Sequence, residues 1–472
     1  MQVSKASNTL PSLRARKPFQ PGTSARLRAP LAGAGLLATL ILGLGTALAQ
    51  DAASSSVLFE NVRVFDGKSD ALTEPTNVLV EDGKIATISA APIEASGASV
   101  IEGAGRTLMP GLIDAHWHAM LIRSTPEEGL NNDSGYTTLL AADEAKATLM
   151  RGFTTVRDMG GPVFSLKRAI DEGLVDGPRI YPSGAIISVT SGHGDFRHQW
   201  ELPRRPGELS RMEELGVAMI ADSPDEVRMR AREQLMLGAS QIKLTAGGGV
   251  ASPFSPLDAS TFTADELTAA VEAASNWGTY VAVHAYTPEA IERALSVGVK
   301  VIEHGHLMDE VDAKAMAEKG IWLSTQPFDE SFEEGVTLPE ASRARLRQVI
   351  TGTDRIYGWA KQYGIKTAFG TDILFSPAMA QLQGHMLTLL TRWYTPAEAL
   401  AMATGTNGEL LQLTGLRNPY PGKLGVVEEG ALADLLLVDG DPIANINLVA
   451  NPANFVVIMK GGKVYKNTLP TN

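Results

Sequence analysis

Two histidines with one residue between them, His116 and His118, end an apolar and β-prone run that begins at Met109. In a β-strand, residues i and i+2 project from the same face, so both imidazoles would point toward one position. Imidazole is the commonest protein ligand for zinc-type metals. By itself such a pair is more often two ordinary polar residues at a strand end, so further ligands must come from elsewhere in the chain.

The elements that would position such ligands alternate between strand and helix from about residue 109 to residue 420. Eight segments have the pattern of short strands: 111–118, 154–158, 179–183, 241–244, 280–285, 301–305, 322–326 and 366–372. Helical patterns lie between them, for example at 143–150, 222–237, 263–277, 288–297 and 313–318. This alternation is typical of an α/β protein with a parallel sheet, and eight repeats predict a closed (β/α)8 TIM barrel.

Both ends of the chain have β-like patterns instead. Short strand patterns lie at 57–65, 77–80, 84–88, 433–438, 455–459 and 463–465. Asp66-Gly67 and Asp82-Gly83 have the composition of hairpin turns. We therefore expect a small β-sandwich domain built from both termini, residues 50–108 and 421–472, around a barrel at 109–420.

Polar residues end several of the predicted barrel strands, where the active site of such a barrel lies. Lys243 stands between Ile242 and Leu244, so it would face the barrel interior if they face the helices. The other candidates are the residues at the ends of strands five, six and eight: His284, His304 and Asp372. Each alone is more often a satisfied polar group, but four of only eight histidines at strand ends make coincidence a poor explanation.

This arrangement resembles the amidohydrolase superfamily in its two-metal form. The runs 110–118, 302–305, 370–372 and 430–435 carry the resemblance, which covers nearly all of the chain after its first 49 residues. It implies two divalent ions, zinc by preference, and carbamylation of Lys243 into a carboxylate that bridges them. It also implies attack on an amide by a metal-bridging hydroxide, with Asp372 passing the proton to the leaving amine. The implied metal ligands are His116, His118, Lys243, His284, His304 and Asp372.

Within the superfamily the chain is similar to the prolidase and imidazolonepropionase-like group, which includes bacterial ochratoxin-degrading amidohydrolases. The runs 159–161, 191–195 and 243–249 carry this similarity. It implies a small-molecule or dipeptide substrate with a free carboxylate beside the scissile amide. Candidate substrate-binding residues are His193, His198, Tyr286 and His306. His306 also competes with His304 for the role of ligand on the sixth strand.

We therefore expect a metal-dependent amidohydrolase that releases a C-terminal amino acid, of the carboxypeptidase or Xaa-Pro dipeptidase type. Its substrates would be N-acyl amino acids, with ochratoxin A among the candidates. The alternatives are a cyclic-amide hydrolase of the imidazolonepropionase type and a periplasmic binding protein without catalysis. Loops 188–216 and 252–260 are candidate lids. The run Gly247–Gly249 lacks a phosphate-binding frame and indicates close backbone packing.

The composition sets the remaining limits. A formal charge of −12 over 472 residues argues against a nucleic-acid partner, and the absence of cysteine excludes disulfides and thiolate ligands. Residues 1–49 contain six basic residues, no acidic residue and an apolar run. They end in Ala47-Leu48-Ala49, which has the pattern of a signal-peptidase cleavage site. They predict a cleaved signal peptide, hence a periplasmic or secreted protein without a membrane anchor. The resemblance implies a homo-oligomer, with an octamer among the candidates.

Overall fold

The computed structural model describes residues 56–470 except 206, 253 and 337. The predicted signal peptide lies outside the described residues. Within them, no helix has the length and apolar character that a membrane crossing requires.

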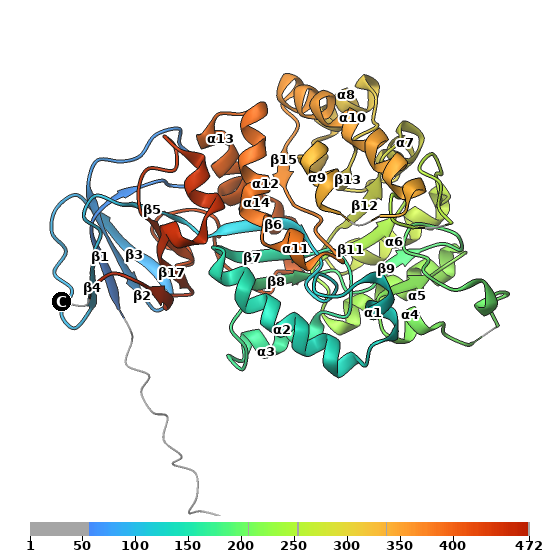
Figure 1. The fold of residues 1–472 in the computed structure, drawn as a ribbon, viewed down its shortest axis with the longest axis horizontal. Coiled ribbons are helices and arrows are strands. Elements are labelled where there is room, and N and C mark those ends of the chain that lie inside the picture. Colours follow the sequence, from blue (N-terminus) through green and yellow to red (C-terminus); the bar gives the residue numbers. More distant parts are fainter. Residues whose placement is uncertain (1–55, 206, 253, 337, 471–472) are drawn as a thin grey trace, which may run out of the picture. The chain divides into compact units, whose positions relative to one another are not determined.

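Strands from both ends of the described chain form one mixed sheet unit, blue and dark red in Figure 1. Its strands are β1 (Val57–Val64), β2 (Thr76–Glu81), β3 (Lys84–Ser89), β4 (Ser99–Glu102), β5 (Thr107–Pro110), β16 (Leu435–Val438), β17 (Phe455–Lys460) and β18 (Lys463–Asn467). They are ordered β18-β17-β16-β5-β1-β2-β3, and β4 pairs with β1. Antiparallel pairing of β16 with β5 joins the two ends of the chain. Asp82 and Gly83 between β2 and β3 have φ of 48° and 73°, as a type I′ hairpin requires.

All eight predicted barrel strands are present and run parallel to their neighbours. They are β6 (Leu112–Trp117), β7 (Phe153–Asp158), β8 (Arg179–Pro182), β11 (Ile242–Thr245), β12 (Val281–Ala285), β13 (Val301–His304), β14 (Trp322–Thr325) and β15 (Thr367–Phe369). The third barrel strand continues beyond Gly184 (φ 74°) as β9 (Ile186–Ser188), which pairs with β11. A bond of 2.8 Å from the Asp372 amide to the His116 carbonyl joins the first strand to the end of the eighth.

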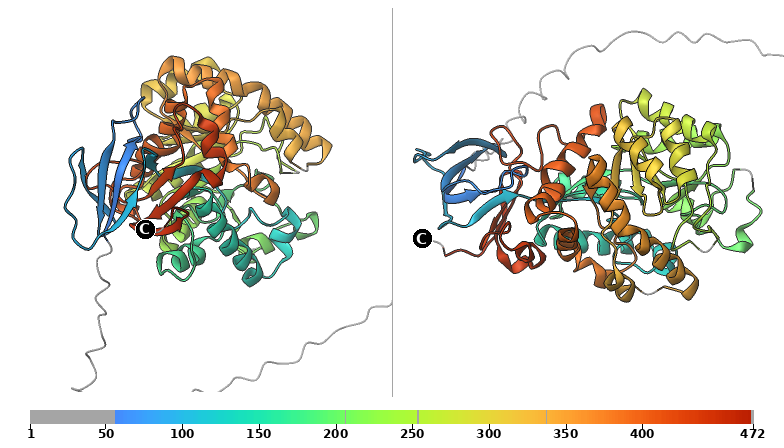
Figure 2. Two further views of the ribbon diagram at one scale, coloured as in Figure 1. Left: turned by 60° about the vertical axis from the view of Figure 1, so that its left-hand side comes forward. Right: turned by 90° about the horizontal axis from the view of Figure 1, so that it is seen from above.

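Helices surround the barrel strands, as the two views of Figure 2 show. Their bounds are α1 (Pro126–Asn131), α2 (Ser134–Met150), α3 (Phe164–Asp171), α4 (Arg211–Glu214), α5 (Pro224–Leu237), α6 (Ala264–Asn276), α7 (Pro288–Ser296), α8 (Glu310–Lys319), α9 (Glu330–Gly335), α10 (Glu340–Tyr363), α11 (Pro377–Ala380), α12 (Gln383–Leu389), α13 (Pro396–Ala401) and α14 (Asn407–Leu411). The five predicted helices correspond to α2, α5, α6, α7 and α8. Local signals fix their ends: Thr263 and Glu266 form a capping box at the start of α6, and left-handed Gly238 ends α5.

Several elements differ from the sequence expectation. Helix α2 begins nine residues earlier than 143, because Asp133 caps it by accepting the amides of Gly135 and Tyr136. Helix α10 and the short strand β10 (Ala218–Ile220) were not predicted.

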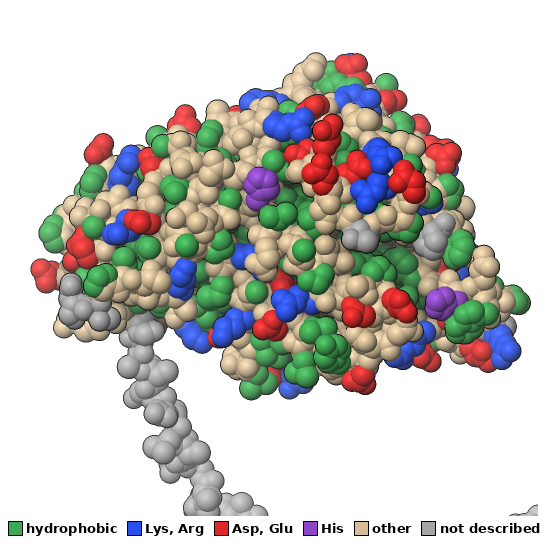
Figure 3. Space-filling view, viewed as in Figure 1, with side chains coloured by type: hydrophobic (Ala, Val, Ile, Leu, Met, Phe, Trp, Pro, Cys, Tyr) green, Lys and Arg blue, Asp and Glu red, His purple; other side chains and the backbone are tan. Residues whose placement is uncertain are grey.

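On the face of Figure 3, acidic and basic side chains are mixed rather than gathered into a basic stripe.

Candidate active site

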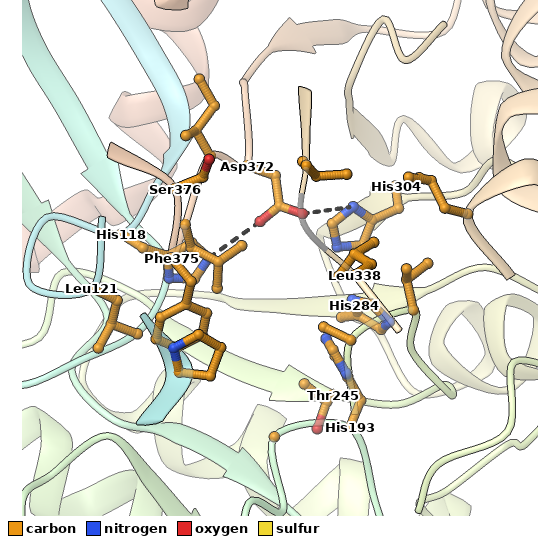
Figure 4. Close-up of a pocket in the computed structure, with 18 of the residues that line it drawn as sticks. His118, Leu121, His193, Thr245, His284, His304, Leu338, Asp372, Phe375 and Ser376 are labelled. Atoms are coloured by element: carbon orange, nitrogen blue, oxygen red, sulfur yellow. Dashed lines mark hydrogen bonds and ion pairs between the residues drawn. The ribbon is translucent and has the colours of Figure 1, made fainter. Parts of the chain in front are cut away.

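The six predicted metal ligands converge at the carboxyl ends of the barrel strands. His116 lies in β6 and His118 follows it, Lys243 lies in β11, His284 in β12 and His304 ends β13. Asp372 follows β15 and faces His118 and His304, as Figure 4 shows. His304 and Asp372 have positive φ, 72° and 53°, which is uncommon for residues with side chains and clusters at functional sites. The backbone is therefore turned sharply at the points where these two side chains enter the site.

The spacing of the donor atoms suits a metal ion. Asp372 Oδ1 lies 3.2 Å from His116 Nε2 and 3.2 Å from His118 Nε2. Ligands bound tetrahedrally to zinc at 2.0–2.1 Å are about 3.3 Å apart. One ligand atom each from His116, His304 and Asp372 also lies within 4.8 Å of the others. This His/His/Asp group can therefore hold a cation.

The hydrogen bonds of the four histidine rings support the same conclusion. In each ring one nitrogen is held by a protein oxygen: His116 Nδ1 by Glu303 Oε2 (2.8 Å), His118 Nδ1 by Gly160 O (3.2 Å), His284 Nε2 by Gly248 O (2.8 Å) and His304 Nδ1 by Gln326 Oε1 (2.7 Å). Because these oxygens accept hydrogen bonds, each bonded nitrogen carries the proton. In the neutral ring the other nitrogen keeps its lone pair, as metal-binding histidines require. In His116 and His118 this nitrogen lies 3.2 Å from Asp372 Oδ1, the separation of two ligands of one cation. The ligand atoms would be Nε2 of His116, His118 and His304, and Nδ1 of His284.

Two buried residues that the sequence reasoning missed hold His116 in place. Glu303 bonds His116 through Oε2 and pairs with Arg157 Nη2 through Oε1 at 2.7 Å. Both Glu303 and Arg157 are fully buried. Glu303 directly precedes His304 in the 302–305 run, and this adjacency was the available signal. Arg157, on β7, gave no such signal, because nothing local connects it with Glu303.

Lys243 faces the barrel interior, as its apolar neighbours predicted. Its side chain is buried, and Nζ lies 3.4 Å from His116 Nε2. Among the described residues no carboxylate oxygen comes within 4.0 Å of Nζ. Burial lowers the pKa of Lys243, although the carboxylates of Glu303 and Asp372 oppose this shift. Burial therefore makes the ammonium form of Lys243 less favourable than that of an exposed lysine.

Asp372 is a carboxylate in this environment. Burial alone raises its pKa, but the imidazoles of His116 and His118 beside the carboxylate outweigh that effect. The pKa of Asp372 is therefore held below its ordinary value. Its side chain is 18% exposed, more than those of the histidines around it, so one face is open to the cavity.

Of the four predicted substrate-binding residues, the structure brings two into the cavity. His193 and Tyr286 line it. The Tyr286 ring stacks on His304 with centroids 5.0 Å apart, and burial raises the pKa of its hydroxyl well above the ordinary value. His198 lies exposed and stacks on Trp200, away from the lining. His306 is turned away, because the Gln326 carbonyl holds its Nε2 at 2.9 Å and its ring packs on Phe328.

The run Gly247–Gly249 packs closely against the site. A Cβ on Gly249 would lie 1.9 Å from His193 Nδ1, and one on Gly248 would lie 1.7 Å from the Pro256 carbonyl. The Gly248 carbonyl is the acceptor for His284. Close backbone packing, as expected from the sequence, therefore accounts for these glycines.

The six candidate ligands lie at the polar end of a cavity of about 170 Å³, and five of them line it. Its walls are mainly apolar and come from several loops that follow barrel strands. The large wall residues include Leu121, Phe196, Phe328, Phe332, Phe375 and Met379. The segment between β14 and α10, which includes α9, supplies Phe328 and Phe332, and no sequence pattern predicts a cavity wall there. The candidate ligands therefore form one end of the cavity, called its metal-type floor below. The apolar walls leave room for an apolar group.

Comparison with known proteins agrees with this geometry. The sequence model of the Amidohydrolase family matches residues 107–465. Ochratoxinase from Aspergillus niger is 32% identical over 383 residues, which are 76% of this chain and 75% of that protein. The structure of a prolidase complexed with N-methylphosphonate-L-proline is 33% identical with a TM-score of 0.80, covering 88% of this chain and 100% of that one. A Xaa-Pro dipeptidase with methionine bound in its active site is 29% identical with a TM-score of 0.76, at the same coverage.

The match spans most of the chain, and the likeness in fold extends over the sheet unit and the barrel together. The chain therefore belongs to the amidohydrolase family, as an enzyme that acts on C–N bonds.

Proposed function

We propose that this enzyme hydrolyses the amide bond between an apolar acyl group and a C-terminal amino acid. One observation carries the proposal: metal-type donors form the floor of a cavity whose walls are apolar. Substrates of this class are N-acyl amino acids, Xaa-Pro dipeptides and ochratoxin A, which would yield ochratoxin alpha and phenylalanine. The relatives support this class of substrate: they include an ochratoxinase, a prolidase and a Xaa-Pro dipeptidase.

We propose two divalent cations, zinc by preference, as cofactors. His116 and His118 with Asp372 would hold one, and His284 and His304 the other. A carbamate on Lys243 would bridge them, which is consistent with a buried amine that has no carboxylate partner among the described residues. Such cations polarise an amide carbonyl and lower the pKa of bound water to about 7.

The protein groups then have separate tasks. Asp372 Oδ1 lies between His116 and His118, so Oδ2 is the oxygen available to take a proton from the attacking water and pass it to the leaving nitrogen. The Tyr286 hydroxyl stays protonated and is a hydrogen-bond donor for a substrate oxygen. The apolar walls hold the acyl group and exclude bulk water, which strengthens these polar contacts.

The test combines metal content with a substrate panel. The purified protein is analysed for bound metal and then assayed with N-acyl amino acids, Xaa-Pro dipeptides, ochratoxin A and imidazolonepropionate. We expect about two zinc ions per chain, turnover of the first three classes, loss of activity on chelation and recovery with zinc. Asp372→Asn is the control for contaminating activity. Turnover of imidazolonepropionate alone would indicate a cyclic-amide hydrolase, and metal-free protein without turnover would indicate a binding protein.

We also propose that residues 1–49 direct export and are then removed, and that the mature chain assembles as a homo-oligomer without nucleic acid or membrane. The composition of residues 1–49 supports export, and the resemblance to oligomeric amidohydrolases supports assembly. The mass of the N-terminal peptide after expression tests the first point. Light scattering on the purified protein tests the second, and a monomer would contradict it.

A further inference from the structure

A buried serine hydroxyl connects two loops beside the metal-type floor. Ser252, in the loop after β11, has no exposed surface. Its Oγ lies 3.0 Å from the amide nitrogen of Gly194 and 2.8 Å from Nδ1 of His193, both in the loop after β9. The Ser191 hydroxyl adds a second link between these loops by donating to the Phe254 carbonyl at 2.7 Å.

The protons of this contact can be assigned. The Gly194 amide donates to Ser252 Oγ, so the proton of the serine hydroxyl must be donated to a different group. A buried hydroxyl proton requires an acceptor, and among the described residues His193 Nδ1 is the one within reach. The Nδ1 atom of His193 therefore carries the lone pair, and Nε2 carries the proton.

This assignment is the reverse of that in the four candidate metal-binding histidines. In each of them the nitrogen bonded to the Glu303, Gly160, Gly248 or Gln326 oxygen carries the proton, so the other nitrogen carries a lone pair. His193 lies beside His284 with ring centroids 4.2 Å apart, as Figure 4 shows, yet its free nitrogen is a donor. The two neighbouring imidazoles are thus prepared for opposite tasks: one for a cation, the other for an oxygen atom with negative charge.

The backbone around Ser252 is also fixed from the far side. Arg345, on α10, donates from Nη1 to the carbonyls of Gly249 (3.1 Å), Ser252 (2.8 Å) and Ser255 (3.3 Å). One guanidinium group therefore binds three carbonyls of this loop. These contacts fix the backbone at Ser252 and with it the position of the Ser252 hydroxyl.

We propose that Ser252 is a positioning residue that keeps His193 in its Nε2–H form, so that this imidazole donates to the carboxylate of the substrate's amino acid. The idea rests on the proposed function, since it assumes a substrate with a free carboxylate. In the described lining of the cavity no arginine is present, and the single lysine is Lys243 of the ligand group. A neutral donor at His193 supplies the recognition that such a carboxylate needs.

The kinetic test compares two probes, N-benzoyl-L-phenylalanine and its C-terminal carboxamide, with cleavage of the benzoyl amide as the readout. We expect Ser252→Ala to lower the preference for the free acid in kcat/KM about tenfold, the value of roughly one hydrogen bond. His193→Ala should lower it about 10- to 100-fold, and the double variant should equal His193→Ala. Ser255→Ala, which removes another fully buried hydroxyl from the same loop, should leave the preference unchanged.

A structural role for Ser252 would lower both probes equally and add to the effect of His193→Ala, and that result overturns the proposal. A second measurement does not depend on turnover. Nitrogen NMR of protein labelled at its eight histidines, with His193→Ala for assignment, should show His193 protonated at Nε2 in the wild type. A proton on Nδ1 would overturn the proposal even in an active enzyme. An inactive enzyme with the proton on Nε2 would refute the proposed function while retaining the role of Ser252 in fixing His193.

Discussion

Glu303→Gln tests how the protein prepares His116 for a metal. The carboxylate serves two partners, His116 Nδ1 at 2.8 Å and Arg157 Nη2 at 2.7 Å, and all three residues are buried. An amide of the same shape has one acceptor oxygen. Because the Arg157 guanidinium can only donate, the amide oxygen must face it, and the amide nitrogen then donates to His116 Nδ1. This forces the His116 proton onto Nε2 and removes the lone pair that would bind the metal.

Two effects of different size follow. Removing one partner of a buried ion pair costs about 3–5 kcal/mol of stability, because Arg157 keeps its buried charge. Loss of the group that orients a ligand histidine lowers metal affinity about 10- to 100-fold. Zinc affinity is measured on metal-free protein by competition with a chromogenic chelator, and stability is measured by urea unfolding of the same preparation.

Asp434→Asn is the matched control. Asp434 is also buried and pairs with Arg179 through contacts of 2.8 and 3.1 Å, but it lies in the sheet unit and touches no candidate ligand. It should lose comparable stability with unchanged zinc affinity. Zinc affinity of Glu303→Gln within about threefold of the wild type, or an equal loss in Asp434→Asn, would refute the assignment of the His116 proton.

Four further changes have expected outcomes. Lys243→Ala should lower kcat/KM by at least about 100-fold and reduce zinc content, because the bridging carboxylate is lost; unchanged values rule out the carbamate. Tyr286→Phe should lower kcat about 10- to 100-fold with small change in KM if its hydroxyl acts in the transition state, and an effect confined to KM would contradict this. Gly249→Ala should lower kcat/KM about tenfold, because its Cβ would lie 1.9 Å from His193 Nδ1; wild-type kinetics would contradict that close packing. Lys460 has a pKa lowered by burial from 10.5 to about 8, so between these values the unfolded chain binds more protons and stability rises with pH. Lys460→Met should therefore remove on the order of 2 kcal/mol of this rise, seen as a melting temperature that depends less on pH; an unchanged slope would refute it.

Much of the site could be predicted because its signals are local. The spacing of His116 and His118 places them on one face of a strand whatever the rest of the chain does. The apolar neighbours of Lys243 fix which way it points, and alternation of strands and helices defines the barrel whose strand ends carry His284 and His304. These patterns depend on residues within a few positions of each other. Over that range, the local sequence largely determines the backbone conformation.

The closed barrel decided what the sequence left open. His193 and His198 are five positions apart in one predicted loop, yet one ring lines the cavity and the other stacks on an exposed tryptophan. Their fates differ because Ser252, from a loop after another strand, holds the first. Arg157 and Glu303, 146 positions apart, meet only because β7 and β13 enclose the same barrel. Proton positions, cavity walls and buried ion pairs depend on such distant contacts, and those exist only once every strand has taken its place.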